Sequence, residues 1–204
     1  MALIGFSGAG GTGKTTVANY LGSNIPSIVD YLRKEFYGQS SKFNQLDNFD
    51  EILRFQYGIL YAQVGLEKIL PDLFDNDIIP IERSTIDYAA YLLHQSDRFE
   101  LTNSQIIDIK RYVEKCIDHA NKYYDGIVYF PTGQFTPADA EGSSKERDEE
   151  SIKKTDTYIN NLLEHLSIPT IRLRSSRIES RAKAVTDFYD WCQKNKDSGH
   201  TLDL

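Results

Sequence analysis

The chain has 204 residues, with 23 Lys and Arg against 30 Asp and Glu, so its formal net charge is −7. This length fits one α/β domain with a full core, and the acidic balance makes duplex nucleic acid a less natural partner than a small substrate. Two cysteines outside any metal-ligand spacing argue against a zinc site, and no signal peptide or membrane-spanning run is found. We therefore expect a cytoplasmic protein that makes no contact with a membrane.

The first predicted element is a strand at residues 3–6, and a glycine-rich segment follows it directly. The segment 8–15 reads GAGGTGKT and fits the pattern G-x-x-x-x-G-K-[ST], and a helix is predicted over 15–21. In this order of strand, loop and helix, backbone amides cradle the phosphates of a nucleoside triphosphate, Lys14 adds a point charge and Thr15 can ligate Mg²⁺. The residues expected to bind the nucleotide here are Gly8, Gly10, Gly11, Thr12, Gly13, Lys14, Thr15 and Thr16.

A second strand is predicted at residues 27–30, which places Asp30 at its carboxyl end. A long helix follows, capped by Asn48 or Asp50, with apolar residues at mixed three- and four-residue steps. Because proline cannot continue a helix readily, we expect Pro71 to end it.

The third predicted strand covers residues 77–82, and a helix follows at about 84–93. Thr102 or Asn103 opens another helix that reaches residue 124, and 126–130 is an apolar run typical of a buried strand.

The last third of the chain begins with a segment at about 131–147 that is rich in Gly, Ser, Thr and Pro, and we expect it to be a mobile lid. A helix to about residue 165 and a strand at 168–173 follow. The final helix begins at Ser176, and the tail at about 195–204 is expected to fray.

Strands that alternate with helices predict a parallel sheet with helices on both faces. We therefore expect an α/β fold of the P-loop NTPase type, with three layers, a five-stranded parallel sheet and a lid segment. The chain shows no internal repeat and no linker, so 1–204 is predicted to be a single domain.

Ligands in such a sheet lie beyond the carboxyl ends of the strands, where three polar segments are expected to meet. These are the phosphate loop, Asp30, and the segment Glu82-Arg83-Ser84. An acid at the end of an apolar strand is costly unless it faces a metal, a base or a cation. The alternative is that Glu82 pairs with Arg83 or another basic group and only shapes the loop.

An acceptor pocket is expected between the helix at 48–70 and the helix after Ser84, because both are rich in aromatic residues. Such rings can stack on a base, and glutamine amides can hydrogen-bond its edge. The alternative is that the rings recur at helical spacing because they form the buried face of each helix. The residues in question are Phe49, Phe55, Tyr57, Tyr61, Tyr88, Tyr91, Gln56 and Gln63. No role is assigned to the four histidines.

These motifs together resemble the P-loop nucleoside and nucleotide kinases. Deoxynucleoside kinases have a similar Glu-Arg-Ser segment and a basic lid, here Lys145-Glu146-Arg147. The stretch 81–91 and the lid followed by a long helix also resemble the ribosylnicotinamide-kinase-like, AAA-type ATPase domains of phage and bacterial proteins.

The resemblance implies a role for each residue near the phosphate loop. Lys14 would hold the β- and γ-phosphates, while Thr15 and Glu82 would hold Mg²⁺, Glu82 through water. Arg83 would orient the acceptor or the transferred phosphoryl group. Asp30 is the candidate base for the acceptor hydroxyl, with Glu82 as the second choice.

It also implies cationic residues around the rest of the nucleotide. Lys145 and Arg147 would close over the phosphates from the lid and offset the charge that develops during transfer. Arg177 or Arg181 would flank the adenine, an assignment based on position alone.

The leading hypothesis is thus an ATP- and Mg²⁺-dependent kinase of a nucleoside, a nucleotide or a related small molecule. One alternative is a kinase of a hydroxymethylated base in DNA. If the chain is phage-encoded, the expected location is the host cytoplasm. A third hypothesis is a nucleotide-gated regulatory ATPase that moves the lid against a partner. The acceptor and the oligomeric state, including a homodimer, stay open.

Overall fold

The computed structural model describes residues 2–22, 46–73, 78–134 and 149–195. Within these residues a single parallel sheet has the strand order β2-β1-β3-β4. Its strands are β1 (Ala2–Ser7), β2 (Ile78–Ile81), β3 (Gly126–Tyr129) and β4 (Thr170–Arg172). The strand that carries the phosphate loop therefore lies between β2, which ends just before Glu82, and β3.

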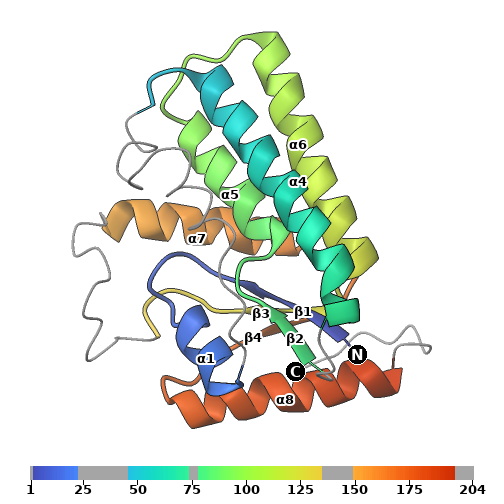
Figure 1. Cartoon of the computed structure of the whole chain (residues 1–204). Helices are drawn as coiled ribbons and strands as arrows, with labels where there is room; N and C mark the ends of the chain where they lie inside the picture. Colours follow the sequence, from blue (N-terminus) through green and yellow to red (C-terminus); the bar gives the residue numbers. More distant parts are fainter. Residues whose placement is uncertain (1, 23–45, 74–77, 135–148, 196–204) are drawn as a thin grey trace.

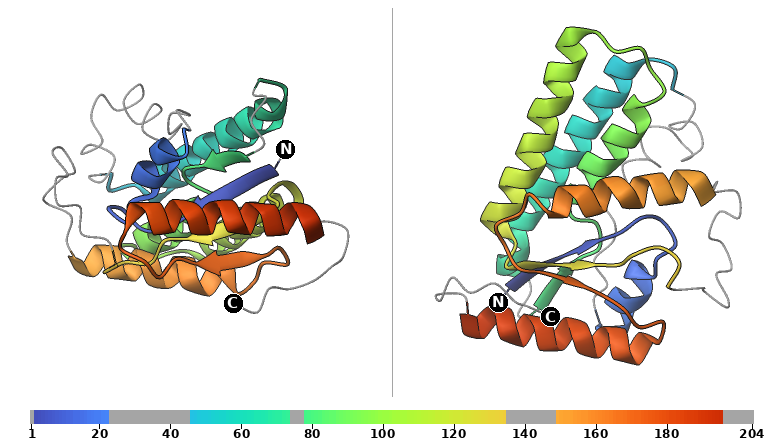
Figure 2. Two further views of the ribbon diagram at one scale, coloured as in Figure 1. Left: turned by 90° about the horizontal axis from the view of Figure 1, so that it is seen from below. Right: turned by 180° about the vertical axis from the view of Figure 1, so that it is seen from behind.

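Helices cover both faces of this sheet, which gives three layers (Figure 1). The helices are α1 (Lys14–Tyr20), α4 (Phe49–Leu73), α5 (Thr85–Ser96), α6 (Asn103–Tyr123), α7 (Glu149–Leu163) and α8 (Ile178–Asn195). Helices α4 to α7 lie on one side, and α1 and α8 on the other. Figure 2 shows α8 running along its face of the sheet, where it packs against α1, β1 and β3.

Two apolar cores lie on the two faces of the sheet, as the alternation of side chains along a strand requires. Leu3 of β1 packs into the core under α4 to α7, whereas its neighbour Ile4 packs into the core under α1 and α8. Both faces of β1 are buried along its whole length, which explains why the strand reads as a continuous apolar run. The cysteines Cys116 and Cys192 are buried packing residues, as expected.

The expected order of strands and helices is confirmed for the described residues. Four of the five expected strands are present, and the fifth, at residues 27–30, lies outside the residues that the structure describes. Thr102 caps α6 through a capping box with Gln105, so the first of the two proposed caps is correct. Most of the lid expected at about 131–147, from residue 135 onward, and the expected tail beyond residue 195 also lie outside the described residues.

One expected boundary is wrong, because α4 continues through Pro71 to Leu73. Proline fixes a backbone φ that a helix tolerates and removes only one amide donor, which is a small loss near the end of a 25-residue helix. None of the helices in the described ranges is long and apolar enough to span a bilayer.

Candidate nucleotide-binding site

The phosphate loop joins β1 to α1 and depends on glycine at two points. A Cβ atom on Gly8 would collide with the carbonyl oxygen of Phe130, which follows β3, so only glycine allows the two chains to approach this closely. Gly13 stands immediately before α1 with φ 86°, a left-handed conformation that other residues rarely adopt. Thr15 and Thr16 are exposed on the first turn of α1, where the motif predicts contact with phosphates.

The side chain of Lys14 is folded under the loop, with only 5% of its surface exposed. Its ammonium donates to the carbonyl oxygens of Gly8 and Ala9, the latter at 2.8 Å, and to Oγ1 of Thr12 at 3.3 Å. Burial lowers the pKa of Lys14, and the negative charge of Asp87 opposes this effect. Lys14 is therefore held in position by atoms of the phosphate loop itself.

Thr15 and Glu82, the two predicted magnesium ligands, lie next to each other. The hydroxyl of Thr15 donates to Oε1 of Glu82 at 2.5 Å, although the residues are 67 positions apart in the sequence. Among the described residues no three His, Cys, Asp or Glu side chains form a metal cage. A hydroxyl and one carboxylate nevertheless suit Mg²⁺, which keeps several waters and takes oxygen ligands from the phosphates of its nucleotide.

The segment after β2 is held against β1 by buried hydrogen bonds. The amide of Ser84 donates to the carbonyl of Phe6 at 3.2 Å, and the hydroxyls of Ser84 and Ser7 share a short hydrogen bond. The next amide, that of Thr85, donates to the hydroxyl of Tyr124 at 3.2 Å. The backbone that follows Glu82 is thereby fixed beside the phosphate loop.

Arg83 contacts Tyr91, which lies two turns into α5. One guanidinium nitrogen donates to the Tyr91 hydroxyl at 3.3 Å, and the guanidinium carbon lies 5.4 Å from the ring centroid. Burial acts to raise the pKa of Tyr91, but the charges of Arg83 and Lys14 outweigh it and lower this pKa. Glu82 itself contacts Thr15, and its pairing with Arg83 or another basic group stays an alternative.

The two arginines proposed to flank the adenine lie in different environments. Arg181 is fully buried. Its Nη1 donates to the carbonyl of Thr12 at 2.7 Å, and its Nε donates to the carbonyl of Ser175 at 2.6 Å. Its guanidinium therefore braces the phosphate loop from the side of α8. Arg177 is exposed immediately before α8, and its expected place beside the adenine stays a prediction.

Three predicted residues lie outside the described part of the chain, namely Asp30, Lys145 and Arg147. Their expected roles as base and lid cations stay predictions.

Several residues predicted to line the acceptor pocket form part of the core instead. Tyr88 is 2% exposed and donates to Gln63, which itself donates to Glu67. Gln56 is also buried, and its carbonyl and side-chain oxygens face the hydroxyl of Tyr112. These amides have partners among the helices, so their proposed role in reading a base is corrected to one in helix packing.

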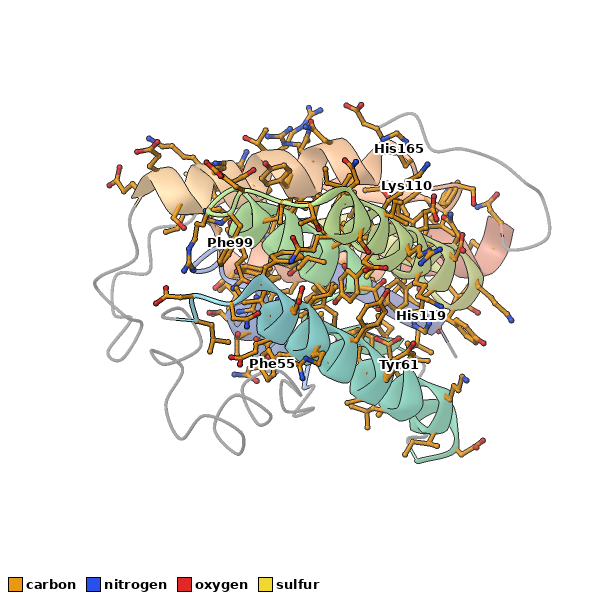
Figure 3. The ribbon with its side chains drawn as sticks, turned by 90° about the horizontal axis from the view of Figure 1, so that it is seen from above. Phe55, Tyr61, Phe99, Lys110, His119 and His165 are labelled. Carbon is orange, nitrogen blue, oxygen red and sulfur yellow. The ribbon has the colours of Figure 1, made fainter. Side chains whose placement is uncertain are left out.

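Other aromatic residues of α4 lie closer to the surface. Figure 3 shows Phe55 and Tyr61 on α4, and His119 between α4 and α6. Phe55 is half-buried and packs against the core. Tyr61 is 61% exposed and stacks on Tyr57 at 5.9 Å between ring centroids. Phe49, at the start of α4, is an exception, because it is buried against Phe99 and belongs to the core.

The sequence was compared with protein-family models, and residues 3–181 match an AAA domain. The chain belongs to this AAA domain family. The match begins in β1 and ends at the arginine that braces the phosphate loop. No match was found among curated protein sequences.

Solved structures with the same fold include two of a deoxyadenosine kinase from M. mycoides. The one with bound dCTP superposes with a TM-score of 0.63 at 14% identity, covering 93% of this chain and 99% of that chain. The one with bound dATP gives a TM-score of 0.59 at 12% identity, covering 93% and 100%. The resemblance to P-loop nucleoside kinases is therefore confirmed at the level of the fold.

Sequence reasoning missed Asp87, which is fully buried beneath the phosphate loop. Its Oδ1 accepts a hydrogen bond from the amide of Gly8 at 3.0 Å, and its Oδ2 lies 3.9 Å from Nζ of Lys14. Asp87 stands three residues after Ser84, in the spacing of a capping box, which predicts an exposed acid that only caps a helix. In the structure residues 84–90 are all buried, which the spacing alone does not indicate.

Proposed function

We propose that the protein is an ATP- and Mg²⁺-dependent kinase that phosphorylates a nucleoside, a nucleotide or a related small molecule. The contact between Thr15 and Glu82 beside the buried Lys14 is the observation that carries the proposal. This contact supports a magnesium site next to the phosphate loop. The shared fold with a deoxyadenosine kinase supports a nucleoside acceptor.

The described residues suggest how the nucleotide would be held. Lys14 would neutralise charge on the β- and γ-phosphates. The hydroxyl of Thr15 would ligate Mg²⁺ and the carboxylate of Glu82 would hold the ion through water, so that the ion offsets the phosphate charge. Arg177 would lie against the adenine. Arg83, held by Tyr91, is a preorganised cation for the transferred group or the acceptor.

In the transfer step, the acceptor oxygen forms a bond to the γ-phosphorus while the bond from that phosphorus to the bridging oxygen of ADP breaks. The proton of the acceptor hydroxyl passes to a carboxylate, for which Asp30 is the first candidate and Glu82 the second. Lys145 and Arg147 of the lid would stabilise the charge on the transferred group.

The proposal is tested with purified protein, γ-labelled ATP, Mg²⁺ and a panel of nucleosides, deoxynucleosides and nucleotides. We expect label to pass to at least one acceptor, and Lys14→Ala to reduce this transfer at least about hundredfold. Asp118→Asn serves as a control, because Asp118 is exposed on α6. Hydrolysis of ATP without transfer to any acceptor would count against a kinase.

The family favours a second candidate, a nucleotide-gated regulatory ATPase, since the chain matches an AAA domain. Such a protein would hydrolyse ATP slowly without an acceptor and respond to a partner instead. Asp30→Asn separates the two hypotheses, because a kinase would lose transfer while keeping nucleotide binding and a switch would be nearly indifferent. Salt-sensitive DNA binding would instead point to a kinase of DNA bases.

A further inference from the structure

A buried carboxylate beneath the phosphate loop has no place in the proposed transfer step. Asp87 lies in the first turn of α5 with no exposed surface, and it is connected to the loop rather than to its own helix. One oxygen accepts the amide of Gly8, and the other lies 3.9 Å from the ammonium of Lys14. The side chain that should bind phosphate is therefore also the counterion of a protein carboxylate.

We propose that Asp87 competes with the bound nucleotide for the charge of Lys14 and thereby weakens nucleotide binding in a pH-dependent manner. The inference rests on the proposed function only in assuming that a nucleotide phosphate lies at Lys14. Asp87 is in this view a regulatory residue of the loop and not a catalytic one.

The local structure shows that the carboxylate is directed to the loop. Ser84 and Asp87 have the spacing of a capping box, yet the Ser84 side chain makes no cap hydrogen bond. Its hydroxyl bonds Ser7 at the end of β1, and Asp87 bonds Gly8, the next residue. Two side chains that usually cap a helix thus join α5 to the end of β1 and to the first residue of the loop.

Burying a carboxylate here costs free energy unless cations compensate it. Burial raises the pKa of Asp87 to about 6, while the charges of Lys14 and Arg83 and hydrogen bonds from Gly8 and Ser7 act to lower it. Of the other titratable groups that face this site, Tyr91 of α5 and Tyr129 of β3 interact with Asp87, and Glu82 interacts with Lys14. Asp87 can therefore change its charge near neutral pH.

The sign of the effect follows from the charges. A phosphate at Lys14 adds negative charge near Asp87, which raises the pKa of Asp87 in the complex above its value in the free protein. Nucleotide binding then takes up a proton, and affinity falls as the pH rises through about 6 and above. At pH values above the pKa of Asp87 in the complex, nucleotide affinity is reduced by the ratio of the acid constants of Asp87 in the free protein and in the complex. A pKa that rises by one on binding therefore corresponds to about tenfold weaker binding.

The test is calorimetric titration of the full chain with ADP and Mg²⁺ over a range of pH, for wild type and Asp87→Asn. Asparagine keeps an oxygen for the amide of Gly8 and removes the charge. We expect the variant to bind about tenfold more tightly than wild type near pH 8 and about equally near pH 5. Protonation of the nucleotide itself affects both proteins alike and cancels in the ratio.

Asp118→Asn is the matched control, because it removes one charge from an exposed position on α6. A ratio that does not change with pH, or an Asp87→Asn variant that binds more weakly throughout, overturns the inference and leaves the proposed function intact. If wild type binds no nucleotide at any pH, the proposed function has failed instead.

A second measurement covers the case in which Asp87→Asn does not fold. Titration of wild type in buffers of different ionisation enthalpy measures the protons exchanged on binding. Net proton uptake near pH 7 supports the inference. Net release, or no exchange, contradicts it.

Discussion

The brace formed by Arg181 offers the sharpest test of how the phosphate loop is held. We predict that Arg181→Met destabilises the protein and weakens nucleotide binding, although Arg181 would touch no phosphate. The guanidinium is fully buried, and it joins Thr12 in the loop to Ser175 before α8. Methionine fills part of the same space but cannot donate to either carbonyl.

The size of the effect can be worked from these contacts. Hydrogen bonds from a charged donor contribute about 1.5–3 kcal/mol each, and the guanidinium also lies 5.8 Å from the ring centroid of Phe130. The apolar surface that methionine buries offsets part of the loss, so we expect the free energy of unfolding to fall by about 3 kcal/mol. For a chain of this size that is roughly 6–12 °C in Tm.

The assay is urea unfolding followed by circular dichroism, with and without ATP and Mg²⁺. Arg174→Met is the control, because Arg174 is exposed in the segment before α8 and its substitution should change stability by less than about 0.5 kcal/mol. Stabilisation by nucleotide should be smaller for Arg181→Met than for wild type. A loss no larger than that of the control, below about 0.5 kcal/mol, would refute the brace.

Three further predictions follow from other contacts. Glu82→Gln should lower phosphoryl transfer by about hundredfold, while ADP affinity measured without Mg²⁺ by calorimetry stays within about twofold, because Glu82 acts through the metal. Glu67→Leu should cost about 3–5 kcal/mol in urea unfolding, since buried Glu67 accepts hydrogen bonds from Gln63 and Tyr124 and pairs with His119, whereas Glu67→Gln should cost less. Gly126→Val should cost about 1–3 kcal/mol in the same assay, because a Cβ there would lie 2.6 Å from the Phe188 ring.

The parts of the fold that were predictable have signals confined to a few neighbouring residues. The runs at β1 and β3 are apolar because both faces are buried, and the loop motif needs only eight consecutive positions. The contact between Thr15 and Glu82 was also predictable, since the carboxyl ends of adjacent parallel strands meet at one edge of the sheet.

The failures concern side chains whose partners lie far away in the sequence. Asp87 bonds a residue 79 positions earlier, and Arg181 bonds one 169 positions earlier. An acid in capping-box spacing and an arginine within a helix are both typical of exposed helix faces, so neither pattern indicates a buried charge. The sequence alone does not show that Gln63 is buried, because its partner Tyr88 becomes a neighbour only when α4 and α5 pack together.

Two charges that local patterns missed support the phosphate loop from opposite sides of the sheet. Asp87, on α5, accepts a hydrogen bond from the amide of Gly8. Arg181, on α8, donates a hydrogen bond to the carbonyl of Thr12. Lys14 takes the carbonyls of Gly8 and Ala9 from within. Since protein cations bind these carbonyl oxygens, the loop is left to present its amides to an anion, as phosphate binding requires. Holding the empty loop in this conformation costs free energy. The hydrogen bonds of Arg181 and the charge of Asp87 offset that cost.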